Sequence, residues 1–388
     1  MSLQAEQRGV AVIGMGCISA AGMDVEGHWQ SLEKGLVHCH ATPPWLFQTK
    51  LDLPVFAGPE KGLTEKGQAL LAEVAPEMAQ NAVSRTVLLA LSALAEALRA
   101  ADIDLDFLKK QTVGIVLGTT VGCTFHNEGY YDAWRKGEQP DLSPVRFYLG
   151  GNTAAALHRI LGTRGPSAVI TNACASGTDA IGVAKNWIAS GQCDLAIAGG
   201  ADELSRVAYN GFASLLLASE RPCRPFDRER KGLNLGEGAG ILVLESDASA
   251  RKRSVSPSGW IRGYGSAIDA WHPTAPHPEG RGLQKALKGA LQDGGVDSRH
   301  ISLINAHGTG TKANDLAETS ALSHFFPEPA AVPVVSTKGI TGHTLGAAGA
   351  IEAVFTMLAL KEGRTPGTVG CLHPDHDLTF PVLSQERS

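Results

Sequence analysis

Features typical of membrane, secreted and nucleic-acid-binding proteins are missing from this sequence. Its 388 residues carry a formal net charge of −5, so the basic surplus that binds nucleic acid or anionic membranes is absent. The longest weakly charged stretch, 339–360, includes a histidine and a glutamate and is better explained as a buried helix than as a membrane span. The apolar run Val10–Ile13 is too short for the core of a signal peptide. We therefore expect a cytoplasmic protein that binds neither membranes nor nucleic acids.

Short motifs for metals, disulfides and dinucleotides are also missing. The seven cysteines are scattered without a CxxC pair or a framework spacing, which indicates reduced thiols. The glycine turn at Gly14-x-Gly16 lacks the third glycine of a dinucleotide site, and no acidic residue ends a second strand about twenty residues later. These absences leave a globular protein whose chemistry depends on its own side chains.

What the sequence does contain indicates a layered α/β protein. It is 43% hydrophobic and has 45 glycines, which favours many tight turns and close backbone approaches. Apolar, β-branched runs alternate with stretches of helical periodicity. The segment 40–75 mixes prolines, glycines and charges and predicts an irregular excursion, and 143–161 predicts loop and helix over a cleft. Strands are predicted at 9–16, 112–118, 167–171, 194–200 and 241–244. Helices are predicted at 26–36 and 81–100, and a further one, with apolar residues from 180 to 188 at helical spacing, continues until Gly191.

The second part of the sequence repeats the first in outline. A basic connector at 248–259, with serines and a proline, is the best boundary. After it, 260–265 resembles the opening strand and turn, 301–307 parallels 112–118, and 332–360 parallels 167–188. We therefore predict two duplicated, βαβ-rich halves, 1–250 and 251–388, that share one core.

Cys174 is the strongest candidate for a nucleophile. It follows an apolar strand and precedes a helix of small residues that runs to Gly191. Unpaired N–H groups and the helix dipole at such a turn favour negative charge, which would stabilise a thiolate or the oxyanion of a tetrahedral intermediate.

Two histidines and a lysine occupy comparable turns in the second half. His307 ends a predicted strand, where side chains face the crevice in which α/β proteins bind ligands. Lys338 and His343 lie five residues apart in a turn with glycines. Further polar candidates follow His307: Thr309, Thr311, Asp315 and Glu318.

A cysteine with two histidines suits thioester chemistry. A thiolate can accept an acyl group, and two neutral imidazoles can each donate one hydrogen bond to a carbonyl or enolate oxygen. A zinc site formed by Cys174, His307 and His343 is the competing interpretation, but it would need three ligands from distant segments with no short-range pair. We therefore predict no metal.

These residues lie in motifs that resemble the elongating β-ketoacyl-acyl-carrier-protein synthases, which are thiolase-fold condensing enzymes. The likeness spans nearly the whole chain. The priming synthases carry Cys–His–Asn instead, and a thiolase would have a second cysteine in a CxG-type turn, which Cys371 does not supply. The matching motifs are Thr171–Gly177, Arg224–Gly232, Gly236–Gly240, Asn305–Thr311 and Ser336–His343.

The resemblance implies a five-layer αβαβα fold, a dimer and a condensation mechanism. Cys174 would take an acyl chain from a carrier-protein thioester, and malonyl-carrier protein would then lose CO₂. His307 and His343 would hydrogen-bond the enolate, Lys338 would support this pair, and Glu352 would be the buried partner of the lysine. Asp315 and Glu318 are assigned supporting roles. Thr309, Thr311 and Thr274 match positions that contact the phosphopantetheine arm, which arrives on the carrier protein, so no cofactor is expected.

Two departures from the family pattern leave the activity of the chain open. The sequence stops at Ser388, where the family usually adds a last strand and a Phe-Gly-Gly-Thr-Asn turn that contributes to the oxyanion hole. Basic residues that dock carrier protein are also thinned near Lys136, and Leu216 stands where an arginine is common. Condensation in fatty-acid, aryl-polyene or polyketide assembly is the leading interpretation, in a homodimer or a heterodimer with a second synthase-like subunit. A weakly active partner subunit like a chain-length factor and a thiolase-type acyltransferase are the alternatives.

Overall fold

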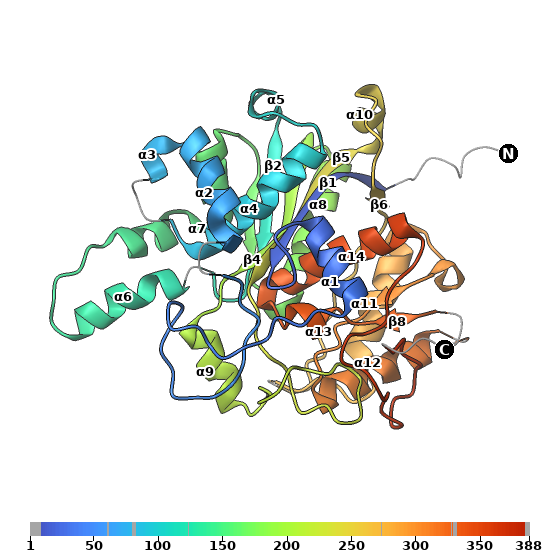
Figure 1. Ribbon diagram of the computed structural model, residues 1–388. Coiled ribbons are helices and arrows are strands. Elements are labelled where there is room, and N and C mark those ends of the chain that lie inside the picture. The colour runs from blue at the N-terminus through green and yellow to red at the C-terminus, as the bar shows by residue number, and fades with distance from the viewer. Residues whose placement is uncertain are drawn as a thin grey trace.

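Six strands form the larger of two sheets in the computed structural model (Figure 1). The structure describes residues 9–59, 62–79, 83–122, 124–272, 274–326, 328 and 332–384. The strands are β1 (Val10–Ser19), β2 (Val113–Gly118), β3 (Ser167–Ile170), β4 (Leu195–Asp202), β5 (Gly238–Ser246) and β6 (Gly259–Ile261). Their order is β3-β2-β4-β5-β1-β6, in which β2 pairs in parallel with β3 and β4, and β5 runs antiparallel to β4 and β1.

Helices cover both faces of this sheet because its central strands are apolar on both faces. Every residue of β2 and β4 is buried, as in strands that lie between two helical layers. On one face, α4 (Arg85–Ala100) packs on β1 and β5, and α2 (Gly62–Val74) packs on α4. On the other face lie α8 (Ser176–Ala189) and α14 (Ala348–Glu362).

A second, smaller sheet lies beyond α14. It consists of β7 (Ile304–Asn305) and β8 (Val334–Val335), which pair in parallel. Apolar side chains of α11 (Arg281–Gly294) and α12 (Lys312–Phe325) pack against these two strands. The layers are therefore helix, sheet, helix, sheet and helix, the thiolase-like arrangement that the family resemblance implies.

The two halves build the same turn at corresponding places. Ala173 has a left-handed φ of 47°, begins a short 3₁₀ turn (Ala173–Ala175) and leads into α8. Leu345 has a φ of 53°, begins the 3₁₀ turn Leu345–Ala347 and leads into α14. The starts of the helices touch, because a Cβ added to Gly177 would lie 2.7 Å from the Gly346 carbonyl oxygen. The internal repeat is thus most regular at the turn that carries Cys174.

The remaining helices connect these layers. Every helix in the described part of the chain is too short or too polar to cross a membrane. Their bounds are α1 Val25–Lys34, α3 Pro76–Ala79, α5 Leu105–Lys110, α6 Thr124–Arg135, α7 Ser143–Leu161, α9 Arg206–Ser214, α10 Asp247–Lys252 and α13 Lys338–Thr341, with a further 3₁₀ turn at Ser298–His300.

Several predicted boundaries are wrong. The segment predicted as irregular, 40–75, contains α2, whose Leu63 and Leu71 are buried against α4. The predicted connector begins with α10, which Ser246 caps by accepting a hydrogen bond from the Ser249 N–H. The strand predicted at 301–307 is reduced to β7, and α7 is one continuous helix rather than loop and helix. The helix predicted from residue 81 begins at Arg85, and residues 81–82 lie outside the described residues.

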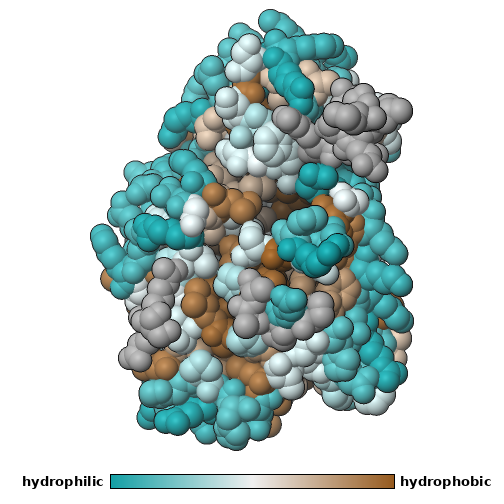
Figure 2. Space-filling view, turned by 90° about the vertical axis from the view of Figure 1, so that its right-hand side faces the viewer, coloured by the Kyte–Doolittle hydropathy of each residue, from teal (hydrophilic) through white to brown (hydrophobic). Residues whose placement is uncertain are grey.

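The outer helix α11 of the second half leaves its leucines more exposed to solvent than the outer helix α4 of the first half does. Leu283, Leu287 and Leu291 of α11 are partly exposed, whereas Leu91 and Leu94 of α4 are fully buried. A view turned by 90° shows hydrophobic side chains around a hollow on the side of the molecule that carries α11 (Figure 2). The thicker hydrophobic core therefore belongs to the half that positions Cys174.

Candidate active site

Cys174 lies in a strained turn between β3 and α8. The left-handed φ of Ala173 is unfavourable for a residue with a Cβ and bends the chain sharply after β3. Ser176 fixes this bend, because its hydroxyl donates to the Ala173 carbonyl at 2.6 Å and accepts from the Asn172 N–H at 2.8 Å. The cysteine is thereby held, partly exposed, at the wall of a cavity.

His343 enters the same cavity from the turn between α13 and α14. Its backbone N–H donates to the Asn234 carbonyl at 2.8 Å, and its Nδ1 accepts the Leu345 N–H at 3.0 Å. A neutral imidazole has one N–H, so this contact places the proton on Nε2. The left-handed Leu345 directs that N–H donor toward the ring, and the turn therefore sets the tautomer as well as the position of His343.

His307 lies just after β7 and is held through its backbone. The Glu318 carboxylate accepts hydrogen bonds from the His307 N–H at 2.6 Å and from the Gly308 N–H at 2.8 Å. Gly308 has a φ of 41°, and a Cβ there would lie 2.5 Å from the Cβ of Ser336. Glycine is required at this position because the backbone passes so close to β8.

Lys338 fixes the tautomer of His307. Its ammonium donates to His307 Nδ1 at 3.2 Å and forms a salt bridge with Glu352 on α14. Because Nδ1 accepts, the proton of the neutral His307 ring also lies on Nε2. The two rings approach edge to face, with centroids 5.2 Å apart. Both histidines therefore present Nε2–H groups as hydrogen-bond donors.

Burial keeps both histidines neutral. Loss of solvent, with a smaller effect of the Lys338 charge, lowers the pKa of His343 to about 3. The same causes, with His343 as a further contributor, hold the pKa of His307 well below its usual value. At neutral pH neither ring is an imidazolium, so each acts as a neutral donor.

Burial outweighs the effect of the helix terminus on the thiol of Cys174, so the thiolate that the sequence led us to expect is not favoured at neutral pH. Burial raises the pKa of Cys174 to about 11, and the opposing effect of Lys338 is smaller. A backbone N–H also favours the thiolate, in the predicted direction, but desolvation outweighs it. The regular helix begins only at Ser176, so Cys174 lies in the 3₁₀ turn before it.

One cavity of about 1030 Å³ contains most of the predicted site. The Thr309 and Thr311 hydroxyls are 2.9 Å apart, and Thr274 lies in the lining near Ile268 and Trp271 in the sequence. Lys338 and Glu352 lie behind the histidines and are not part of the lining. The predicted residues that line the cavity are Cys174, Thr274, His307, Thr309, Thr311 and His343.

Asp315 and Glu318 lie behind the site and hold its loops. Glu318 positions His307 as described, and burial raises the pKa of this carboxyl to about 7. Asp315 accepts from the Phe226 N–H at 2.8 Å and pairs with the buried Arg230 at 3.2 Å. These carboxyl groups position backbone segments rather than line the cavity.

The zinc interpretation has some geometric basis but conflicts with the hydrogen bonding. Cys174, His307 and His343 offer ligand atoms within 4.8 Å of one another. A histidine that binds a metal through Nε2 must carry its proton on Nδ1, but both Nδ1 atoms accept hydrogen bonds here. The ammonium of Lys338 would also repel a cation. The residues present do not fit a zinc site.

Asp202 is a positioning residue that the sequence did not reveal. At the end of β4, its carboxylate accepts from the Thr119 hydroxyl at 2.5 Å, the Thr120 N–H at 2.7 Å and the Gly346 N–H at 2.6 Å. It thus ties the loop after β2 to the turn before α14. The sequence shows only that Asp202 ends an apolar strand. It does not show that the partner of Asp202 is Gly346, which lies 144 residues further along the chain.

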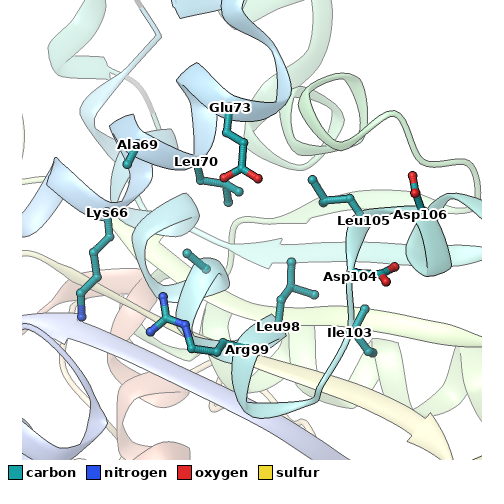
Figure 3. Close-up of a pocket in the computed structure, with 11 residues that line it drawn as sticks. Lys66, Ala69, Leu70, Glu73, Leu98, Arg99, Ile103, Asp104, Leu105 and Asp106 are labelled. Atoms are coloured by element: carbon teal, nitrogen blue, oxygen red, sulfur yellow. The ribbon is translucent and has the colours of Figure 1, made fainter.

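A second hollow lies between α2, α4 and the start of α5 (Figure 3). Its volume is about 560 Å³, and it combines leucines with charged side chains such as Lys66, Glu73 and Arg99. It contains no cysteine or histidine. The described lining of this hollow therefore offers neither the thiol nor the imidazole groups that act in the cavity around Cys174.

The five-layer fold and a cavity that combines a cysteine with two neutral histidines define a thiolase-like condensing enzyme, an acyltransferase. The chain belongs to the β-ketoacyl synthase family: residues 7–250 match the model of the N-terminal domain and residues 258–371 match that of the C-terminal domain. A 3-oxoacyl-[acyl-carrier-protein] synthase 2 from Staphylococcus aureus (strain COL) is 32% identical over an alignment of 392 positions, gaps included, that covers 98% of this chain and 92% of that protein.

Two solved structures show the same likeness in three dimensions. The ishigamide ketosynthase/chain length factor superposes with a TM-score of 0.87 at 30% identity, covering 97% of this chain and 92% of that one. A ketosynthase in complex with its chain length factor, from Xenorhabdus doucetiae, gives a TM-score of 0.72 at 28% identity, covering 100% and 94% of the two chains. The resemblance predicted from the motifs is confirmed.

Proposed function

We propose that this chain condenses an acyl group on Cys174 with malonyl-acyl-carrier protein to give a β-ketoacyl-carrier protein. The observation that carries the proposal is the pair of neutral imidazoles, His307 and His343, with their Nε2–H groups set by Lys338 and Leu345. Two such donors beside a thiol suit a reaction that forms an enolate, because neutral imidazoles can hydrogen-bond the enolate oxygen without transferring a proton to the enolate.

In the first half-reaction the sulfur of Cys174 attacks the carbonyl carbon of an acyl thioester. A C–S bond to Cys174 forms, the C–S bond to the carrier breaks, and the thiol proton of Cys174 leaves with the departing sulfur. Both Nδ1 atoms accept from other donors, so neither imidazole is free to take this proton at Nε2. Lys338 is the nearby cation that favours the developing thiolate.

In the second half-reaction malonyl-carrier protein loses CO₂, and the electron pair of the broken C–C bond forms a thioester enolate. The Nε2–H groups of His307 and His343 hydrogen-bond the enolate oxygen. The enolate carbon attacks the acyl-Cys174 carbonyl, and Cys174 leaves as a thiolate that recovers a proton. Typical effects of such donors are on the order of 10²- to 10³-fold in rate.

Thr309, Thr311 and Thr274 would hold the phosphopantetheine arm of the carrier. Their positions in the lining of the Cys174 cavity support this assignment, because an arm that reaches the sulfur must pass along the wall. We expect no resident cofactor. The six cysteines that the structure describes are free thiols, which fits the cytoplasmic location that we expect.

A second subunit completes the proposed assembly. Strand β3 is at the edge of the large sheet, and Thr171, Asn172 and Ala173 are exposed beside Cys174. An exposed edge strand next to a nucleophile is suited to pair with another chain. The likeness to two assemblies that contain a chain length factor favours a different, synthase-like subunit over a second copy. The retained Cys174 favours the catalytic role over that of a chain-length factor.

The test is the intact mass of the protein after incubation with octanoyl-carrier protein. We expect a stable octanoyl adduct on Cys174, none on Cys174→Ala, and conversion to 3-oxodecanoyl-carrier protein when malonyl-carrier protein is added. A folded wild-type protein that forms no adduct, alone or with a co-purified partner subunit, would contradict the proposed function.

A further inference from the structure

Leu216 occupies a position at the end of α9 where a leucine is out of place. Its φ is +57°, its N–H donates to the Ala213 carbonyl at 3.0 Å, and the Leu217 N–H donates to the Phe212 carbonyl at 3.2 Å. This is the helix ending in which glycine is the usual left-handed residue, because a Cβ is unfavourable there. The Leu216 side chain is nevertheless 88% exposed to solvent.

The leucine is held firmly despite its exposure. Besides the two hydrogen bonds of the helix ending, the Leu233 N–H donates to the Leu217 carbonyl at 2.9 Å. A large apolar side chain in a strained, fixed backbone loses little conformational freedom when a partner covers it. An exposed leucine with a left-handed backbone stabilises neither the fold nor the solubility of the chain. A role in binding another molecule would explain why a leucine stands at this position.

A second apolar segment contributes to the same cavity mouth. Leu215 and Leu217 line the cavity that contains Cys174, and so do Ile268 and Trp271, which are 80% and 59% exposed. The backbone on both sides of this segment is also anchored, because the Asp269 carboxylate accepts from the Gly282 N–H at 2.7 Å and from the His277 N–H at 2.9 Å. Among the described lining residues there is no lysine or arginine. The described part of the lining therefore offers a partner the apolar side chains of Leu215, Ile268 and Trp271 and no lysine or arginine.

We propose that Leu216, Ile268 and Trp271 form an apolar docking rim for the carrier protein, and this inference rests on the proposed function. A protein that inserts a thioester arm toward Cys174 must cover the mouth of the cavity, so the rim is continuous with the path of the substrate. Rigid apolar side chains at the centre of an interface commonly dominate its affinity. Binding through this rim depends little on ionic strength, unlike binding to a lysine- and arginine-rich patch.

The substitution Leu216→Gly separates docking from folding. Glycine relieves the strain at φ +57°, so we expect an unchanged or higher melting temperature. We expect the KM for octanoyl-carrier protein and for malonyl-carrier protein to rise about tenfold. The rate with octanoyl-pantetheine, which reaches Cys174 without a protein partner, should change less than about twofold. Ile268→Ser should raise the same two KM values. Leu360→Ser, at a leucine that is 56% exposed at the end of α14, is the matched control and should leave every KM unchanged.

Salt dependence supplies a second readout. The wild-type KM for octanoyl-carrier protein should change less than about twofold between 50 and 500 mM NaCl, and Leu216→Arg should make it clearly salt-dependent. A steep salt dependence in the wild type, or an unchanged KM in both Leu216→Gly and Ile268→Ser, would overturn the docking rim. An equal loss with octanoyl-pantetheine would also overturn it, because the side chains would then shape the cavity itself.

A wild-type enzyme inert toward octanoyl-pantetheine would contradict the proposed function, and the proposal of a docking rim would then have no basis.

Discussion

The thiol of Cys174 combines a strained backbone with a raised pKa. Ala173 takes a left-handed conformation to present the sulfur, while burial raises the pKa of Cys174 to about 11. A thiol of this kind reacts slowly with general electrophiles at neutral pH and reacts with a substrate that fits the cavity. The raised pKa of Cys174, rather than inaccessibility of its sulfur, therefore limits its reaction with electrophiles from solution.

Alkylation of Cys174 should therefore increase with pH. The thiolate fraction rises about tenfold per pH unit below the pKa, so the iodoacetamide rate at Cys174 should rise about tenfold per unit between pH 7 and 10. Peptide mass spectrometry distinguishes this position from the other cysteines, and Cys174→Ala is the control. A rate that levels off below pH 8 would show that the thiolate is already formed there.

His307→Ala and His343→Ala should reduce malonyl decarboxylation and condensation by on the order of 10²- to 10³-fold, because each removes one Nε2–H donor from the enolate. Octanoylation of Cys174 should be affected much less. His343→Asn is the matched variant, because an asparagine retains an N–H donor and should recover part of the rate. Loss of octanoylation with normal malonyl decarboxylation would reverse the assignment. Intact mass and CO₂ release measure the two steps separately.

At the scale of elements, the contact between α8 and α14 sets the distance between nucleophile and histidine. A Cβ on Gly177 would lie 2.7 Å from the Gly346 carbonyl oxygen and 2.9 Å from the Ala350 nitrogen. Cys174 precedes one of these helices and His343 precedes the other. Any change that separates the helices therefore changes the geometry of the site.

Gly177→Ala should lower the free energy of unfolding by about 1–3 kcal/mol, because the backbone must move to admit the methyl group. It should also slow octanoylation of Cys174. Gly211→Ala in α9 is the matched control, since nothing lies within 4 Å of the added Cβ, and it should raise stability by about 0.5–1 kcal/mol. Urea unfolding and intact mass report the two effects. Equal behaviour of both variants would show that the helix contact is not tight.

The elements that the sequence predicted best are those whose burial is uniform. Strand β2 and the helix after Cys174 follow from apolar periodicity alone, because both lie in the core. Helix α2 was missed because only one side of it packs on α4 and its glycines and charges resemble a loop. The tautomers of His307 and His343 could not be predicted, because they depend on Lys338 and on the backbone of Leu345 in three dimensions.

At the scale of the whole molecule, buried titratable groups make stability depend on pH in opposite directions. Glu203 accepts from the Thr86 N–H, its other oxygen has no partner, and burial raises the pKa of this carboxyl to about 8. The folded state keeps the proton between the ordinary glutamate pKa and about 8, so this contribution to stability is lost as pH rises through that window. His28 and His343, with pKa values lowered to about 4 and about 3, act oppositely: their contribution is lost as pH falls below about 6.5.

Glu203→Gln should remove the loss of stability that ionisation of Glu203 causes as pH rises. Relative to wild type, the variant should gain stability as pH rises from about 4.5 to 8, on the order of 1 kcal/mol per pH unit, and should gain nothing further above pH 8. Urea unfolding at pH 5, 6.5, 8 and 9 measures the difference. Glu138→Gln on the exposed surface is the control. A difference that stays constant over this range would mean that Glu203 is ionised in the folded protein.

The repeated turn described above explains why the site has a single nucleophile. When the left-handed residues Ala173 and Leu345 are aligned, Cys174 corresponds to Gly346. Two turns of the same shape are thus chemically unequal: one carries the sulfur, and the other donates its N–H to Asp202. A side chain at 346 would meet the backbone of Thr119 and Thr120 at 2.6 Å, so no single substitution there can recreate a second nucleophile. Close packing of the backbone around Gly346 therefore keeps the second turn without a side chain, and only the turn at Cys174 carries a nucleophile.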